Sequence, residues 1–241
     1  MLITNAHMAR SIAYAERAGP EWISLDAIKP MSAIYDGALL TPFHAALSEA
    51  PGMKDTPFLI DLGIPGYLLH NDALRIYDLA YRARGDVLEL GTHKGLSTFI
   101  ISTALEDRGG GVLETVDIDG EANTEARHNL CARSGGHRVT FTLLDAADRM
   151  DQLATDGRKF GYVFVDHWHG YDVTRAACER LPAILSDGAF VQFHDFADVG
   201  NIEADHPYGV YQAVLDTVCE DPRFMFVCLS GCTAVFRFNC N

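Results

Sequence analysis

The sequence lacks a basic cluster, and its 33 acidic residues outnumber its 19 basic residues across 241 positions. The resulting net charge of −14 argues against duplex nucleic acid and anionic membranes as partners, because both select lysine and arginine patches. Cysteine pairs are also lacking, since the six cysteines are scattered and none forms a C-x-x-C motif. We expect reduced, mostly buried thiols rather than disulfides or a structural zinc site.

Long apolar runs are absent too, so no segment approaches the roughly 20 residues of a membrane span. The N-terminal stretch MLITNAHMARS has no basic segment followed by an apolar one, which excludes a typical signal peptide. Repeats and low-complexity segments are likewise missing. What remains is ordinary globular composition, with 48% hydrophobic residues, enough for one large α/β domain. We expect a soluble, cytoplasmic protein.

Residues 1–66 and residues 67–241 differ in how regular their sequence patterns are. Residues 1–66 carry six prolines, which interrupt any long element, and short helices are predicted near 5–18 and 42–49. We expect this extension to cap the domain or to mediate self-association into a homo-oligomer. Residues 67–241 are regular and are predicted to form the main domain.

The main domain alternates strands and helices. Strands are predicted at 87–90, 112–117, 139–144, 162–166, 188–195, 224–229 and 233–238. Helices are predicted at 71–84 with Asn71 as cap, 95–107, 120–133, 147–155, 172–185 and 207–220. This order predicts a Rossmann-like α/β fold: a seven-stranded, mostly parallel sheet with an antiparallel C-terminal hairpin strand and helices on both faces. Ligands of such sheets bind beyond the carboxyl ends of the strands.

A glycine-rich turn, ELGTHKGLS (89–97), follows the first strand. Gly91 and Gly95 would let the backbone approach a ligand at a helix N-terminus. The pattern is neither G-x-G-x-x-G nor G-x-x-x-x-G-K-[ST], so neither a dinucleotide nor a nucleotide phosphate is favoured. Glu89 on the strand disfavours phosphate and favours an ammonium group.

Acidic residues end the next two strands. Asp117 can accept hydrogen bonds from ribose hydroxyls, and Asp145, followed by Ala146, could meet an adenine edge. Asp119 is expected to cap the next helix. Together, the acids at three successive strand ends, Glu89, Asp117 and Asp145, suit a ligand with a ribose, an adenine and a cationic amino-acid tail.

Ionisable residues gather at the fourth and fifth strand ends. Asp166 begins the stretch DHWH (166–169), while His194 and Asp195 end the fifth strand. Adjacent strands would bring Asp166, His194 and Asp195 together as a divalent-cation site with open positions.

At this point the motifs resemble a known family. Residues from about 70 to 240 are similar to class I S-adenosylmethionine-dependent methyltransferases, and more closely to the metal-dependent small-molecule O-methyltransferases typified by catechol O-methyltransferase. ELGTHKGLS resembles that family's first motif, E-L-G-x-x-x-G-x-S. VDHWHGY (165–171) resembles its L-D-H-W-K segment, and GAFVQFHD (188–195) resembles its fifth strand.

The resemblance implies roles for particular residues. The cofactor S-adenosylmethionine would be held by Glu89, Gly91, Thr92, Gly95, Ser97, Asp117, Asp145, Ala146 and His167. The metal ligands would be Asp166, His194 and Asp195. Trp168 would flank the substrate or the cofactor, and Tyr208 is a candidate for the substrate pocket. His169 falls where the family has a lysine that takes the substrate's proton.

Two departures from the family pattern affect the chemistry. The family's ligands are Asp, Asp and Asn, whereas the second position here is His194. Magnesium and manganese are the leading metals, and the imidazole makes manganese, iron or zinc more plausible than in the family. Alternatively, His194 turns away and leaves two carboxylates and waters for magnesium. In the second departure His169 replaces lysine, and histidine titrates near neutrality as a base should.

The predicted activity is methyl transfer to a hydroxyl of a small molecule, either catechol-like, phenolic or a sugar-bearing natural product. Three alternatives remain open: a metal-independent N- or O-methyltransferase of the same fold, an NAD-dependent oxidoreductase, and a non-catalytic binding module. The missing G-x-G-x-x-G motif argues against the oxidoreductase. The loop 201–209 is expected to cover the crevice. The aromatic residues that could line a pocket there are Trp22, Tyr35, Phe43, Tyr67 and Tyr208.

Overall fold

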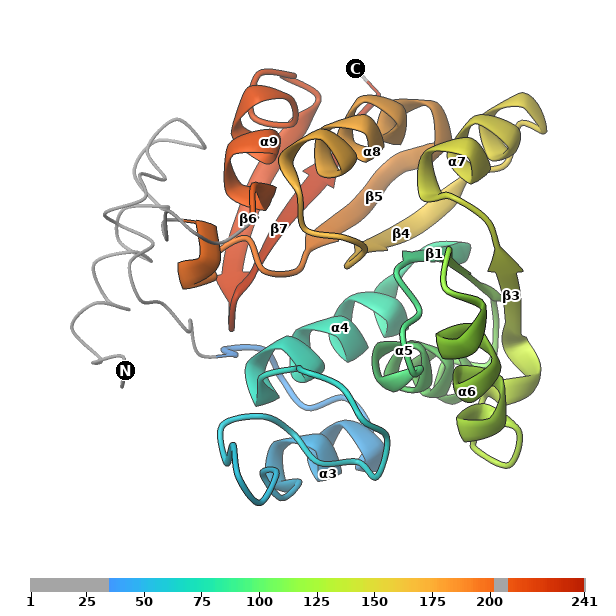
Figure 1. The fold of residues 1–241 in the computed structure, drawn as a ribbon, viewed down its shortest axis with the longest axis vertical. Coiled ribbons are helices and arrows are strands. Elements are labelled where there is room, and N and C mark those ends of the chain that lie inside the picture. The colour runs from blue at the N-terminus through green and yellow to red at the C-terminus, as the bar shows by residue number, and fades with distance from the viewer. Residues whose placement is uncertain (1–34, 202–207, 241) are drawn as a thin grey trace.

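The computed structural model describes residues 35–201 and 208–240. Seven strands form one sheet in the order β3-β2-β1-β4-β5-β7-β6, which confirms the predicted fold class (Figure 1). The strands are β1 (Asp86–Leu90), β2 (Leu113–Asp117), β3 (Val139–Leu143), β4 (Phe160–Val165), β5 (Leu185–Phe193), β6 (Phe224–Ser230) and β7 (Thr233–Phe238). The first five pair in parallel, and β7 runs antiparallel to both β5 and β6.

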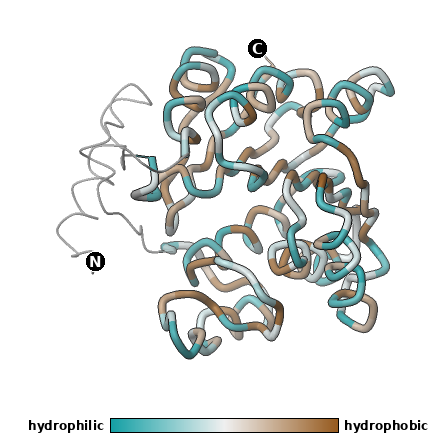
Figure 2. The backbone as a smooth tube through the Cα atoms, in the orientation of Figure 1, coloured by the Kyte–Doolittle hydropathy of each residue, from teal (hydrophilic) through white to brown (hydrophobic). Residues whose placement is uncertain are grey.

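Helices cover both faces of the sheet. They are α3 (Pro42–Glu49), α4 (His70–Arg82), α5 (Leu96–Asp107), α6 (Gly120–Leu130), α7 (Ala146–Thr155), α8 (Tyr171–Ile184) and α9 (Val210–Asp216), with short 3-10 turns η2 (Gly136–Arg138) and η3 (Val199–Asn201). The helices α7, α8 and α9 share one hydrophobic core with the sheet, and α4 and α5 share the other. Their turns alternate between hydrophobic and hydrophilic residues, as expected for helices with one buried face (Figure 2).

The strands β1 and β4 are almost wholly buried, because helices cover them on both faces. They are also neighbours at the point where the strand order reverses: β2 and β3 extend from β1 in one direction, and β4 and β5 in the other. This switch point opens a crevice beyond the carboxyl ends of the strands.

Several element boundaries differ from the predictions. α4 begins one residue before Asn71, and its N-cap is Leu69, whose N–H donates to the Asp72 carboxylate at 3.0 Å. The Asn71 side chain instead accepts a hydrogen bond from the N–H of Tyr35. β5 ends at Phe193, so His194 and Asp195 lie in the following turn.

The prediction of a helix at 42–49 is confirmed by α3, which packs on α4, whereas the predicted helix at 5–18 lies outside the described residues. The described helices include none that is long and apolar enough to cross a membrane.

Candidate active site

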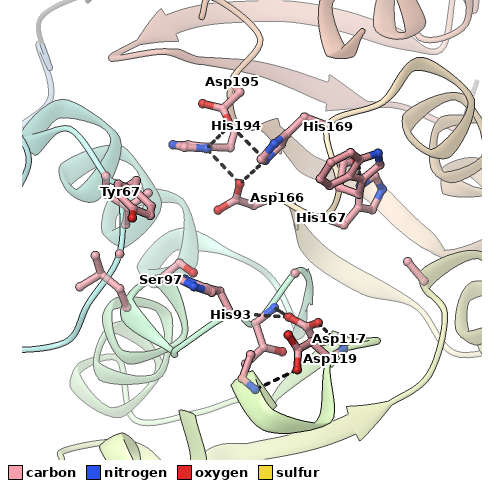
Figure 3. A pocket seen from close by; sticks show the side chains of 18 of the residues that line it. Tyr67, His93, Ser97, Asp117, Asp119, Asp166, His167, His169, His194 and Asp195 are labelled. Atoms are coloured by element: carbon pink, nitrogen blue, oxygen red, sulfur yellow. Dashed lines mark hydrogen bonds and ion pairs between the residues drawn. The ribbon is translucent and has the colours of Figure 1, made fainter. Parts of the chain in front are cut away.

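A cavity of about 870 Å³ occupies the crevice at the switch point. Its lining comes from the segments that follow β1, β2, β3, β4 and β5, together with residues 58–69. The predicted site residues that line it are Gly91, Thr92, Ser97, Asp117, Asp145, Ala146, Asp166, His167, Trp168, His169, His194, Asp195 and Tyr208. Figure 3 shows a cluster of Asp166, His169, His194 and Asp195 on one side and Asp117 with Asp119 on the other.

The glycine-rich turn is shaped by contacts within the protein. Gly91 has a φ of +99°, and a Cβ at this position would lie 2.1 Å from the carbonyl oxygen of Asp166. Gly95 also has a positive φ, and a Cβ there would meet the side chain of Leu130. Gly91 therefore lets the turn pack against the backbone just after β4, which sets Asp166 beside the turn, and Gly95 lets the turn pack against α6. Gly95 itself lies outside the cavity lining.

Asp117 organises the same turn. One carboxylate oxygen accepts the N–H groups of Thr92 at 2.9 Å and His93 at 2.7 Å, and the other accepts the N–H of Asp119. Asp119 caps α6, as predicted, by accepting two N–H groups of its first turn. The Asp117 carboxylate thus faces the cavity from a fixed position.

Glu89 lies fully buried behind the turn rather than in the cavity lining. Its Oε2 accepts hydrogen bonds from the hydroxyls of Thr98 and Thr115, both at 2.6 Å, while its Oε1 is buried without a hydrogen-bond partner. Burial raises the pKa of Glu89 to about 7. A buried, unpartnered carboxylate oxygen favours a cationic group nearby, such as an ammonium.

The third strand contributes Asp145 and Ala146. The Asp145 carboxylate caps α7 by accepting the N–H groups of Ala147 at 2.8 Å and Asp148 at 3.2 Å. Ala146 is the first residue of that helix, and both residues line the cavity. Asp145 therefore has a structural role in addition to its place in the lining.

Four ionisable side chains converge beyond β4 and β5 (Figure 3). His194 Nδ1 lies 2.9 Å from Asp166 Oδ1 and 3.2 Å from Asp195 Oδ2. His169 Nε2 lies 3.1 Å from Asp195 Oδ2 and 3.5 Å from Asp166 Oδ1. The predicted trio is thus brought together, and His169 joins it as a fourth member.

The charges in this cluster are interdependent. Burial acts to raise the pKa of Asp166, but His194 and His169 outweigh it and hold that pKa well below its usual range. Burial acts to lower the pKa of His194, and Asp166 and Asp195 reverse the effect, so that this pKa is raised. Asp195 also adopts a left-handed backbone conformation with φ of 54°, which is strained for a residue with a side chain.

His167 and Trp168 form the wall between the two sides. His167 Nδ1 lies 2.9 Å from the carbonyl oxygen of Trp168, and its Nε2 is buried without a hydrogen-bond partner. Burial lowers the pKa of His167, which favours its neutral form. Trp168 is 65% exposed and stands at the rim with Tyr67 and Phe58, which are 73% and 61% exposed.

The sequence did not predict a role for Asp72 and Cys232, which face the Nε2 atom of His194. The Cys232 Sγ is 3.4 Å from His194 Nε2 and 3.4 Å from Asp72 Oδ2. Cys232 had been expected to be a plain buried thiol, and neither residue belongs to a recognisable motif.

Of the proposed pocket aromatics, Tyr67 and Tyr208 line the cavity, whereas Tyr35 and Phe43 pack in the core against α4. Trp22 lies outside the described residues, as does most of the loop 201–209.

A seven-stranded sheet of this order, with a cavity at its switch point, is a Rossmann-like α/β fold with a ligand crevice. Residues 88–196 match a family model described as "Methyltransferase domain", so the chain contains a methyltransferase domain. No curated protein matches the sequence.

Solved structures with a similar fold include two O-methyltransferases. The O-methyltransferase TomG from Streptomyces achromogenes, solved with S-adenosylmethionine, is 18% identical, with a TM-score of 0.60 over 99% of this chain and 100% of that chain. An O-methyltransferase from Bacillus cereus, solved with S-adenosylhomocysteine, is 15% identical, with a TM-score of 0.54 over 99% of this chain and 93% of that chain. The chain therefore shares the fold of S-adenosylmethionine-dependent O-methyltransferases.

Proposed function

We propose that the chain is a divalent-metal-dependent O-methyltransferase that moves a methyl group from S-adenosylmethionine to a hydroxyl of a small molecule. The observation that carries the proposal is the cluster of Asp166, His169, His194 and Asp195 at one end of a cavity whose other end carries the glycine-rich turn and Asp117.

The residues in the cluster fit a cation. Neighbouring ligands of an octahedral ion with bonds of 2.0–2.1 Å are separated by about 3 Å. His194 Nδ1 lies 2.9 Å and 3.2 Å from carboxylate oxygens of Asp166 and Asp195, yet it has no hydrogen-bond partner. Short separations without hydrogen-bond geometry are typical of atoms that share a central ion. A bound divalent metal would supply a Lewis acid that lowers the pKa of an acceptor hydroxyl.

His169 is the proposed base. Its Nε2 faces the space between the two carboxylates, so an acceptor hydroxyl that enters this space meets the nitrogen. The ring of Tyr208 packs 4.6 Å away, centroid to centroid, and restricts its rotation. The reaction forms an oxygen–methyl bond and breaks the sulfonium–methyl bond, and the hydroxyl proton passes to His169.

The other end of the cavity fits the cofactor. S-adenosylmethionine supplies an electrophilic methyl group when bound. Asp117 offers carboxylate oxygens at the end of β2 for the ribose, and the unpartnered Oε1 of Glu89 matches the ammonium of the amino-acid tail. His167 and Ala146 line the cavity and are the proposed contacts of the adenine.

The exposed aromatic side chains at the rim favour a flat or amphipathic acceptor. Phe58, Tyr67 and Trp168 are large and exposed around a cavity that already contains the polar cluster. Phenolic and catechol-like compounds, or natural products that carry a sugar, combine such a surface with a reactive hydroxyl.

The test is labelled-methyl transfer to a panel of phenols, catechols and glycosides, with manganese, with magnesium and with excess chelator. We expect transfer that chelator abolishes and added metal restores. Undiminished transfer in chelator would rule out the metal role.

A metal-independent methyltransferase of the same fold is the second candidate. One observation favours it: His194 and His169 already lie within ion-pair distance of both carboxylates, so the cluster can be charge-balanced without a cation. Metal analysis of the purified protein separates the two candidates.

A further inference from the structure

The two ring nitrogens of His194 have different surroundings. Nδ1 faces Asp166 and Asp195 across the proposed metal site (Figure 3). Nε2 faces the opposite way, 3.4 Å from Cys232 Sγ and 3.6 Å from Asp72 Oδ2. The imidazole therefore connects the cavity to a second polar group that lies behind it.

This second group is buried and fixed by hydrogen bonds, and Cys232 also reaches the lining of the cavity. Asp72, His194 and Cys232 are all buried. The Asp72 carboxylate is fixed by two backbone N–H groups: that of Leu69 at its Oδ2, 3.0 Å away, and that of Cys232 at its Oδ1, 2.9 Å away. It belongs to the first turn of α4, whereas Cys232 belongs to the turn between β6 and β7.

The chemistry of these atoms determines which nitrogen carries the proton. An ionised carboxylate only accepts hydrogen bonds, and a thiol that donates to it presents its sulfur as an acceptor. Cys232 Sγ has this geometry, with donor contacts to carboxylate oxygens only: Asp72 Oδ2 at 3.4 Å and Asp195 Oδ1 at 3.6 Å. Nε2 thus faces acceptors and is satisfied when it carries the proton.

We propose that Asp72 and Cys232 are positioning residues that hold His194 in the tautomer protonated at Nε2 and thereby present the Nδ1 lone pair to the divalent cation. This inference rests on the proposed function, because it requires a metal at Asp166 and Asp195. Ligating histidines are generally oriented in this way, through a hydrogen bond from the second ring nitrogen.

The unsatisfied state of Nδ1 supports the assignment. The atom is buried, and although Asp166 Oδ1 is only 2.9 Å away, neither carboxylate has hydrogen-bond geometry with it. A bare lone pair beside two carboxylates is repelled unless a proton or a metal ion lies between them, and a metal ion in this place leaves the proton of the ring on Nε2. The same arrangement makes the site one of nitrogen and oxygen ligands, which favours manganese, iron or zinc over magnesium.

The experiment measures manganese binding rather than turnover. Cys232→Ala removes the sulfur but keeps the backbone N–H that fixes Asp72, so the cap of α4 stays intact. Cys232→Ser restores an acceptor, and Asp72→Asn tests the carboxylate directly. Cys178→Ala is the matched control, because Cys178 is a buried thiol on α8 that does not line the cavity.

Manganese affinity is measured by titration followed by electron paramagnetic resonance, and the ¹⁴N modulation of the bound ion reports imidazole coordination. His194→Ala defines the spectrum without this ligand. We expect Cys232→Ala and Asp72→Asn to weaken manganese binding by about 10- to 100-fold and to reduce the ¹⁴N modulation toward that of His194→Ala. Cys232→Ser should lie between Cys232→Ala and the wild type, and Cys178→Ala should match the wild type. Unchanged S-adenosylhomocysteine affinity in each variant shows that the fold is intact.

The results separate failure of the positioning role from failure of the metal proposal. If Asp166→Ala abolishes manganese binding while Cys232→Ala and Asp72→Asn keep wild-type affinity and ¹⁴N modulation, the positioning role is overturned and the metal proposal stands. If the wild type binds no manganese at this site, both are overturned.

Discussion

The two sides of the crevice are built differently, although both lie at the carboxyl ends of one sheet. On the side of β1, β2 and β3, the carboxylates accept backbone N–H groups. Asp117 accepts those of the turn after β1, and Asp119 and Asp145 accept those of the helix that follows each of them. On the side of β4 and β5, the side chains of Asp166, His169 and His194 contact one another or Asp195 instead.

The difference shows how each side is prepared for its ligand. The first side has a rigid backbone frame whose carboxylates are already in place, so it needs no ion to be formed. The second side gathers charges around a buried, unsatisfied nitrogen, and Asp195 has a strained backbone conformation there. We therefore expect changes on the second side to affect chemistry and metal binding, and changes on the first side to affect cofactor binding and stability.

The largest effect should follow Asp166→Ala. It removes a carboxylate that His194 and His169 both face, so metal binding and methyl transfer should fall together, by at least ~10³-fold in turnover. Asp172→Ala, at an exposed position in the first turn of α8, is the matched control. Turnover and calorimetric metal titration check the prediction. A variant that keeps wild-type turnover and metal affinity would show that Asp166 is not part of the site.

His169→Ala should lower kcat by roughly 10²- to 10⁴-fold, as expected for loss of a general base. Metal affinity and S-adenosylhomocysteine affinity should change little, since the proposed ligands are retained. A large loss of metal affinity would instead identify His169 as a ligand. His128→Ala, on the exposed side of α6, controls for the loss of a histidine.

Glu89→Gln changes the side of β1, β2 and β3. It should weaken cofactor binding but raise the stability of the ligand-free protein at alkaline pH. Loss of the charge should weaken S-adenosylhomocysteine binding by about 10- to 100-fold, since a buried charge pair is lost.

Without bound cofactor, Glu89→Gln should also be more stable than the wild type at alkaline pH. The folded pKa of Glu89 is about 7, above its ordinary 4.5, so its contribution to stability is full below pH 4.5 and is lost as pH rises through 7. At pH 8 the variant should therefore be more stable than the wild type by on the order of 2–3 kcal/mol, and the difference should vanish near pH 4.5. Denaturant unfolding at the two pH values measures this, and a pH-independent difference would contradict it.

Gly91→Ala should have the smallest effect on chemistry and a clear effect on stability. The new Cβ would lie 2.1 Å from the Asp166 carbonyl oxygen in addition to the cost of a positive φ. Gly85→Ala is the matched control, because Gly85 has a φ of +103° but no atom within 4 Å of its added Cβ. We expect Gly91→Ala to lose about 1–3 kcal/mol of unfolding free energy beyond Gly85→Ala. Equal losses would show that the turn does not pack tightly against β4.

The sequence predicted the sheet and the cavity residues well, because both depend on local patterns. Strands such as 112–117 and 162–166 end in an aspartate, and parallel strands bring those ends to one edge. The prediction of Asp119 as a helix cap was confirmed for the same local reason.

What the sequence did not reveal depends on distant contacts. Asp72 and Cys232 are 160 residues apart, and only the packing of α4 against the β6–β7 turn brings them behind His194. The cap of α4 was assigned wrongly to Asn71, since the Asp72 side chain and the contact with Tyr35 decide that helix start. The sequence also did not reveal that Gly91, which lines the cavity, lies against the backbone just after β4.

The most direct test of the two-sided account measures S-adenosylhomocysteine affinity and methyl transfer on one preparation as chelator is titrated. If the two sides act separately, cofactor affinity stays constant while transfer falls to background and returns with manganese. Transfer that persists in excess chelator, or cofactor affinity that falls in step with transfer, would contradict the separation of the two sides.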